Sequence, residues 1–121
     1  MDWTPDTLRA ALRTDLVAAM RERDRVAAGA LRTMIAAIDN AEAVAVDADA
    51  PVGDGPIAGA AVGVGAAEAV RRDLTPDDLV ALVTEQVDER RAAAAELAAL
   101  DRPDDVARLH READLLATYL P

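Results

Sequence analysis

The sequence contains no cysteine, no lysine, no serine and no phenylalanine, and several of these absences remove a class of site. Without cysteine there is no disulfide, no thiol nucleophile and no thiolate metal ligand. Without lysine there is no Schiff-base residue and no P-loop lysine, and all 13 basic residues are arginine. Without serine, nucleophilic catalysis would need a threonine or a carboxylate, and no activating base stands beside one. We therefore expect no self-sufficient catalytic site.

Aromatic residues and long apolar runs are also scarce. One Trp and one Tyr among 121 residues leave a core of Leu, Val, Ile, Met and Ala, which favours packed helices over a sheet. The longest apolar run, 57–67, has 11 residues, and spanning a bilayer takes roughly 18 to 20. The acidic start at Met1 and Asp2 lacks the basic region of a signal peptide. We expect a cytoplasmic protein of one small domain with no membrane partner.

Negative charge dominates the chain, with 23 acidic residues and a net charge of −10. Such a charge weighs against general affinity for nucleic acid or anionic membranes. The distribution is uneven: residues 1–42 carry six arginines and seven acids, 43–70 four acids and no arginine, and 71–121 seven arginines and twelve acids. Only the first segment approaches neutrality.

One hexapeptide pattern occurs twice, as WTPDTL at 3–8 and as LTPDDL at 74–79. In each copy a threonine, Thr4 or Thr75, is the predicted N-cap of a helix. The proline that follows suits the first helical position, and the next aspartate lies at the positive end of the helix dipole. The pattern therefore predicts two helix starts, one in each half of the chain.

Apolar residues recur at helical spacing after both starts. Met20 belongs to the apolar stripe of the first predicted helix, and Asp24 is the predicted cap of the second. We expect an all-α domain of two antiparallel helical hairpins, residues 1–46 and 73–121, joined by a long Gly/Ala-rich loop over 47–72. The predicted helices are 5–23, 25–46, 76–100 and 104–119.

Other motifs give weak chemical signals. His110, the one histidine, lacks the glutamate three residues earlier that a metal site in a helical bundle uses, so we predict a surface histidine and no metal. The stretch GVGAAE at 63–68 has glutamate in place of the third glycine of a dinucleotide loop and no preceding strand. Paired aspartates at 77–78 and 104–105 suit helix starts rather than acid–base catalysis. We expect no cofactor.

The arginines indicate a candidate binding surface. Arg21, Arg23 and Arg25 flank the turn predicted between the first two helices, and Arg32 lies two turns beyond Arg25 on about the same face. This corner could hold a phosphate backbone, or neighbouring acids and solvent could absorb its charge.

A second candidate is the pair Arg90 and Arg91 in the third predicted helix. These side chains could contact a partner, or could form pairs within the protein, for example between Arg90 and Glu85 or Gln86.

Three segments, in order, resemble the YqeY-like proteins: DLVAAMRERDRVAAGALRTMIAAIDNAE at 15–42, LTPDDLVALVTEQVDERRAAAAEL at 74–97 and EADLLATYLP at 112–121. That family is related to the tail domain of the B subunit of the glutamine-dependent tRNA amidotransferase. The resemblance implies an all-helical module associated with tRNA or with an enzyme that charges or amidates tRNA. The family is linked to carbon–nitrogen ligase activity with glutamine as nitrogen donor, although this module is not where that chemistry happens.

The resemblance also singles out residues. Of the matching polar positions, Asn40 and Glu42 are expected to be structural, although Asn40 and Arg32 could equally bind a partner. Relatives usually continue past YLP into a second helical lobe and this chain stops at Pro121, which weakens the implied tRNA contact. The matching positions are Asp15, Met20, Asp24, Leu31, Arg32, Ile38, Asn40, Glu42, Arg90, Arg91, Tyr119, Leu120 and Pro121.

Two hypotheses follow. The first is a non-catalytic module that associates with tRNA or with a tRNA-charging or amidating enzyme. The second is a helical module that binds a protein or forms a homo-oligomer and has no role with RNA.

Overall fold

The computed structural model describes residues 2–49 and 73–121, with side chains up to residue 43 in the first part. Its helices are α1 (Pro5–Arg21), α2 (Arg25–Asp49), α4 (Pro76–Ala99) and α5 (Pro103–Ala117). All regular structure in these two ranges is helical, so the all-α prediction is confirmed. The loop predicted over 47–72 begins too early, because α2 continues to Asp49, and its remaining residues lie outside the described ranges.

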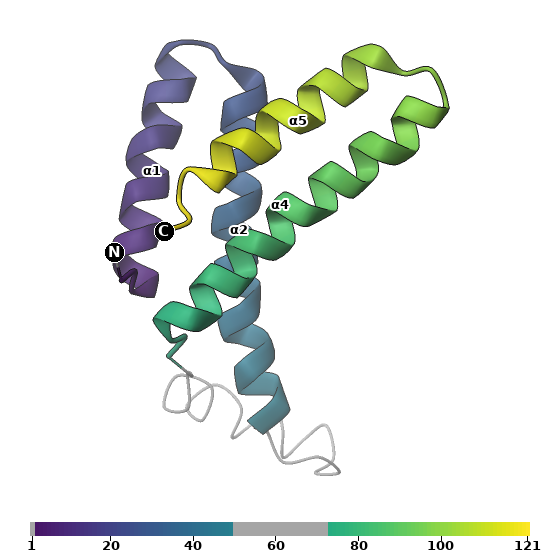
Figure 1. Cartoon of the computed structure of the whole chain (residues 1–121). Coiled ribbons are helices and arrows are strands. Elements are labelled where there is room, and N and C mark those ends of the chain that lie inside the picture. Colours follow the sequence, from purple (N-terminus) through teal and green to yellow (C-terminus); the bar gives the residue numbers. More distant parts are fainter. Residues whose placement is uncertain (1, 50–72) are drawn as a thin grey trace, which may run out of the picture.

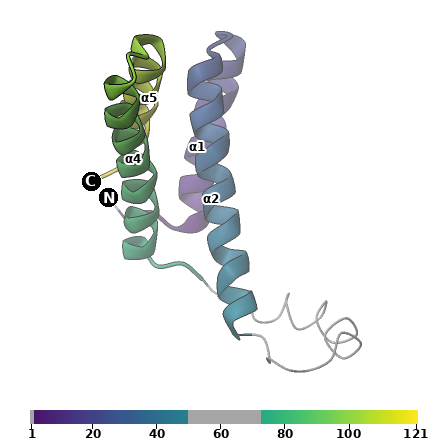
Figure 2. The ribbon, with the colours of Figure 1, turned by 90° about the vertical axis from the view of Figure 1, so that its right-hand side faces the viewer.

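The helices form two antiparallel hairpins, α1 with α2 and α4 with α5 (Figure 1). The hairpins pack against each other as two layers, which are seen edge-on in Figure 2. α2 lies against both α4 and α5, and the far end of the α4–α5 hairpin extends beyond the first layer (Figure 1).

Both predicted helix starts are capping boxes. The Thr4 hydroxyl accepts from the backbone N–H of Thr7 at 3.1 Å, and the backbone N–H of Thr4 donates to the Thr7 hydroxyl at 2.8 Å. At α4, Thr75 accepts from the Asp78 N–H at 3.1 Å and donates its own N–H to the Asp78 carboxylate at 2.9 Å. Because these bonds satisfy backbone donors that lack intrahelical partners, each start is fixed by its own local sequence.

Each hairpin turns through a residue with a left-handed backbone. Arg23 follows α1 with φ of 58°, and Asp101 follows α4 with φ of 54°. The N–H of Asp24 donates to the carbonyl of Ala19 at 2.9 Å, as in a Schellman motif, and α4 ends with the same pattern. The turn leads straight into the next helix, since the Asp24 carboxylate accepts from the N–H of Ala27 at 3.1 Å and caps α2.

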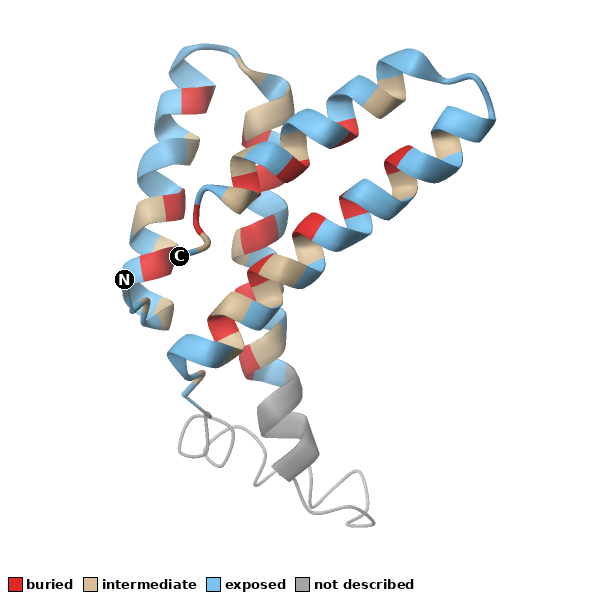
Figure 3. Ribbon diagram, viewed as in Figure 1, coloured by how far each residue is buried: buried red, intermediate tan, exposed pale blue. Residues whose placement is uncertain are grey.

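The core lies between the two layers, where buried positions of both hairpins face each other (Figure 3). With no phenylalanine available, aliphatic side chains fill it, and alanines such as Ala30 and Ala113, which have no exposed surface, occupy its narrower parts. The largest fully buried side chains are Leu8, Leu12, Leu31, Met34, Ile38, Leu79, Val83 and Leu116.

Polar contacts hold α5 and the C-terminal segment to the first hairpin. The indole N–H of Trp3 donates to the carbonyl of Tyr119 at 2.8 Å, and the two rings lie 6.3 Å apart. The Tyr119 hydroxyl donates to the carboxylate of Asp15. Arg111 of α5 forms two hydrogen bonds with Asp24 in the α1–α2 turn. One side of the first hairpin thus contacts α5 and the C-terminal segment, and its opposite side is exposed to solvent.

A candidate phosphate-binding face

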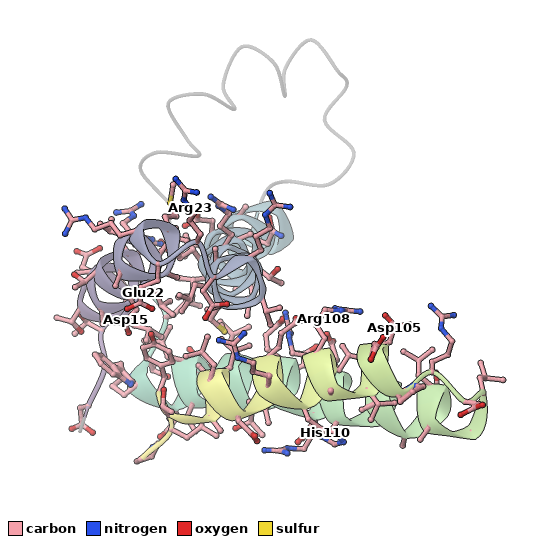
Figure 4. The ribbon with its side chains drawn as sticks, turned by 90° about the horizontal axis from the view of Figure 1, so that it is seen from above. Asp15, Glu22, Arg23, Asp105, Arg108 and His110 are labelled. Carbon is pink, nitrogen blue, oxygen red and sulfur yellow. The ribbon has the colours of Figure 1, made fainter. Side chains whose placement is uncertain are left out.

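The face of α1 and α2 that is turned away from α4 and α5 is here called the outer face. Figure 4 shows guanidinium groups gathered along this edge of the molecule, where Arg23 is labelled. Arg13, Arg21, Arg23, Arg25 and Arg32 are all exposed, and none forms an ion pair or hydrogen bond with any residue that the structure describes. Four of them are the corner predicted from the sequence.

The other described arginines are all engaged in ion pairs. Arg9, for example, donates to Asp39 at 2.9 Å and to Glu42. Burial lowers the pKa of Arg9, but the hydrogen bonds to these carboxylates more than offset it, so the pKa lies above the ordinary arginine value. Unpaired positive charge in the described ranges is therefore confined to α1, α2 and their turn. The remaining paired arginines are Arg90, Arg91, Arg102, Arg108 and Arg111.

An open hollow of about 480 Å³ lies on the outer face at the α1–α2 turn. The buried residues Ala19 and Ala28 form its floor, and the exposed side chain of Met20 forms part of its rim. The other lining residues are Arg23, Asp24, Arg25 and Arg32.

Asp24 does not cancel the positive charge of this hollow. Its hydrogen bonds to Arg111 and to the N–H of Ala27 hold the pKa of its carboxyl below the ordinary value, so the group is ionised and already compensated by Arg111. Arg23, Arg25 and Arg32 remain uncompensated, and the hollow adjoins the N-terminal turn of α2, where the helix dipole adds positive potential. The arrangement is suited to an anion.

Along α1, two arginines and two exposed apolar residues share the outer face. Val17 follows Arg13 by four residues, and Met20 and Arg21 follow Val17 by three and four residues. These spacings place all four on one side of the helix. Val17 is 46% exposed and Met20 is 53% exposed. The prediction that Met20 lies on the buried stripe is wrong, because the buried side of α1 is centred on Leu8, Leu12 and Ala19, and Met20 lies about 100° around the helix from Ala19.

Asp15 and Glu22 lie on the other side of α1, whereas Asp6 in its first turn is exposed and pairs with Arg9. Figure 4 shows Asp15 and the cap residue Glu22 turned away from the edge that carries Arg23. Together with Arg111 they line a smaller cavity of about 250 Å³ between α1, α2 and α5. The outer face of α1 is therefore kept clear of these carboxylates.

Arg90 is not available to a partner, which corrects its selection as a binding residue. Its side chain is only about 10% exposed and donates to Glu112 at 3.1 Å and to the Gln86 side chain at 2.9 Å. It therefore links α4 to α5, and the alternative interpretation of an internal pair with Gln86 is confirmed. Arg91 is exposed and lies 3.4 Å from Asp114, on the second hairpin and away from the outer face.

The two residues expected to be structural have different environments. Glu42 is buried and accepts from Arg9, which ties α2 to α1. Asn40 is exposed and bonds to no described residue, so it does not hold the helices together. Because Asn40 lies on the solvent side of α2, it is accessible to a partner. Of the two interpretations of Asn40, contact with a partner is the one that remains.

His110 is exposed on α5, and no group of three or more potential metal ligands occurs within residues 2–49 and 73–121. No helix in those ranges is both long and apolar enough to cross a bilayer.

Arg13 is the member of the outer face that the sequence interpretation missed. It lies eight residues, about two turns, before Arg21, close to the seven-residue spacing that relates Arg25 to Arg32. A helical projection of α1 with its leucines placed inward would have identified it.

No family model, no curated protein and no solved structure matches the chain. The resemblance to the YqeY-like proteins consequently remains a prediction based on the three segments quoted above.

Proposed function

We propose that the chain is a non-catalytic helical module that binds RNA through its outer face. The observation that carries the proposal is the concentration of unpaired, exposed arginines on α1, α2 and their turn, while the described arginines elsewhere are ion-paired. Guanidinium–phosphate contacts supply most of the affinity in sequence-independent nucleic-acid binding. The choice of tRNA rests on the resemblance to the YqeY-like proteins.

The dimensions of the outer face suit several phosphates at once. Arg25 and Arg32 are separated by about 10 Å along α2, and Arg13 and Arg21 by about 12 Å along α1, from the helical rise of 1.5 Å per residue. A nucleic-acid duplex such as DNA carries one negative charge per roughly 1.7 Å of its axis. A face of this length therefore spans several charges.

The placement of the aromatic residues favours phosphate recognition over base stacking as the source of binding. Stacking on exposed bases uses aromatic side chains, and the two in this chain, Trp3 and Tyr119, pack on each other near the chain termini. Contacts to phosphate position a protein on nucleic acid without reading its sequence. The proposed binding is accordingly weakly dependent on sequence.

A second candidate function has its own support. Val17 and Met20 expose apolar surface among the arginines, and an apolar centre with a charged rim is typical of protein interfaces. The partner would then be a protein with an acidic rim, such as a tRNA-charging or amidating enzyme, or a second copy of this chain.

The test is a titration of tRNA against the protein at several salt concentrations. Contacts from up to five arginines predict that log K falls with log salt with a slope of about −3.5 to −4.5. The double variant Arg25→Gln/Arg32→Gln is expected to weaken binding and flatten the slope by about 1.4 to 1.8. The matched control, Arg91→Gln/Arg102→Gln, removes the same charge from the second hairpin and should bind as the parent does at 0.15 M salt, where charges farther than about 8 Å from the RNA are screened.

Absence of tRNA binding at low salt would remove the RNA proposal. Light scattering and co-purification then test the second candidate, which predicts a dimer or a complex. A strictly monomeric chain that retains no partner counts against it.

A further inference from the structure

Within the outer face, the hollow at the α1–α2 turn differs from the rest because it is concave and has three arginines around a floor of alanine. From this geometry we propose that it binds the terminal phosphate of a nucleotide, that is, a phosphate monoester. The proposal deepens the RNA-binding function and rests on it for the source of the phosphate, an RNA strand end. A free nucleoside monophosphate presents the same chemistry.

Charge favours a monoester over the diester of an internal backbone position. A phosphate monoester carries about −1.5 to −2 charges at pH 7 and has three terminal oxygens, whereas a diester carries one charge and has two. Arg23, Arg25 and Arg32 supply three guanidinium groups, and Asp24 is compensated by Arg111 from the other side. Guanidinium–phosphate hydrogen bonds of this kind are short and charge-assisted.

Backbone positions reinforce this charge. Arg25 is the first residue of α2, so an anion in the hollow also lies at the positive end of that helix. Arg23 has a left-handed backbone at a place where glycine would be unstrained, so an arginine there is held at some cost to stability. The strained backbone places the Arg23 side chain at the hollow, where its guanidinium group can contact the phosphate.

Space and apolar surface indicate that the group carrying the phosphate is a nucleotide. A volume of about 480 Å³ exceeds what a phosphate needs and falls in the usual range for pockets that take small organic ligands. Met20 is 53% exposed at the rim, and thioether sulfur makes favourable contacts with aromatic rings such as nucleobases. The phosphate would meet the arginines while the base lies against Met20.

The experiment uses one RNA hairpin prepared with a 5′-phosphate and with a 5′-hydroxyl, and measures both by fluorescence anisotropy. Loss of a charge-assisted hydrogen-bonded group predicts that the phosphorylated form binds about tenfold more tightly. Arg32→Gln is expected to reduce this preference to within about twofold. The control Arg13→Gln removes a charge from the outer face away from the hollow, and should weaken both hairpins equally while keeping the preference.

Adenosine monophosphate, with inorganic phosphate as comparison, distinguishes the two sources. A preference between the hairpins assigns the site to a strand end, and saturable binding of adenosine monophosphate that is lost in Arg32→Gln assigns it to a free nucleotide. Equal binding of both hairpins together with no binding of adenosine monophosphate overturns the proposal while the RNA-binding function stands. Failure of both hairpins to bind at low salt overturns the function itself.

Discussion

Arg23 and Asp101 occupy the left-handed position that usually follows a helix as glycine. For a residue with a Cβ this conformation costs about 1 to 2 kcal/mol, and the greater flexibility of unfolded glycine returns about 0.5 to 1 kcal/mol of that. Both side chains lack a partner among described residues, so replacing them removes no contact. The two turns are thus equivalent in backbone and opposite in charge.

Arg23→Gly and Asp101→Gly are each expected to stabilise the fold by about 0.5 to 1 kcal/mol, measured by urea unfolding. Only Arg23→Gly should also weaken binding of the phosphorylated hairpin, because only Arg23 lines the hollow. If Arg23→Gly is more stable than the parent and binds less well, then Arg23 contributes to binding and not to folding. Weaker binding by Asp101→Gly to the same degree would contradict the assignment of the site to the first hairpin.

The arginines show which part of the site could be predicted from the sequence and which could not. Arg21, Arg23, Arg25 and Arg32 were found from spacing alone, because a helical turn sets which of them share a face. Arg90 could not be distinguished from Arg91 in this way, since its burial depends on how α4 lies against α5. Local spacing defines the face of one helix, and packing between helices decides whether that face meets solvent.

At the scale of elements, the helix starts were predictable and the ties between layers were not. Thr4 and Thr75 form their caps with residues three positions along the chain, so the signal is contained in a hexapeptide. The contacts of Tyr119 with Asp15 and Trp3 join residues more than 100 positions apart. Nothing in the local pattern of either segment specifies those contacts.

The tie between Tyr119 and α1 predicts an alkaline dependence of stability. Burial, together with the hydrogen bond to Asp15 and its negative charge, raises the pKa of Tyr119 well above its ordinary value. Its contribution to stability is complete below pH 10, where the unfolded tyrosine is also protonated. Above pH 10 only the unfolded state loses the proton, so stability should fall by about 1.4 kcal/mol per pH unit.

This dependence can be assigned to one side chain, because the chain has no lysine, no cysteine and no second tyrosine. Urea unfolding between pH 8 and 11.5 is the measurement. Tyr119→Phe loses the hydrogen bond to Asp15 and should be about 2 kcal/mol less stable at pH 8, with a flat profile above pH 9.5. A Phe variant whose stability declines as steeply as that of the parent would show that Tyr119 is not the titrating group.

At the scale of the whole molecule, the two hairpins carry different charge. Residues 2–43 have six arginines and seven acids, whereas 73–121 have five arginines and twelve acids. The exposed acids of α4, such as Glu85, Glu89 and Glu96, belong to the layer that lies behind the outer face. A phosphate-rich partner would therefore be attracted by one layer and repelled by the other, so the net charge of −10 orients such a partner rather than excluding it.

Replacing Glu85, Glu89 and Glu96 together with glutamine tests this long-range effect. Screening acts over about 30 Å at 0.01 M salt and about 8 Å at 0.15 M, so tRNA affinity should rise severalfold at the lower salt and by less than about twofold at the higher. Arg25→Gln/Arg32→Gln should instead weaken binding at both concentrations, because direct contacts are screened less than distant charges. If the glutamine variant gained as much affinity at 0.15 M as at 0.01 M, the acids would lie close to the bound RNA. The outer face would then not be where the RNA binds.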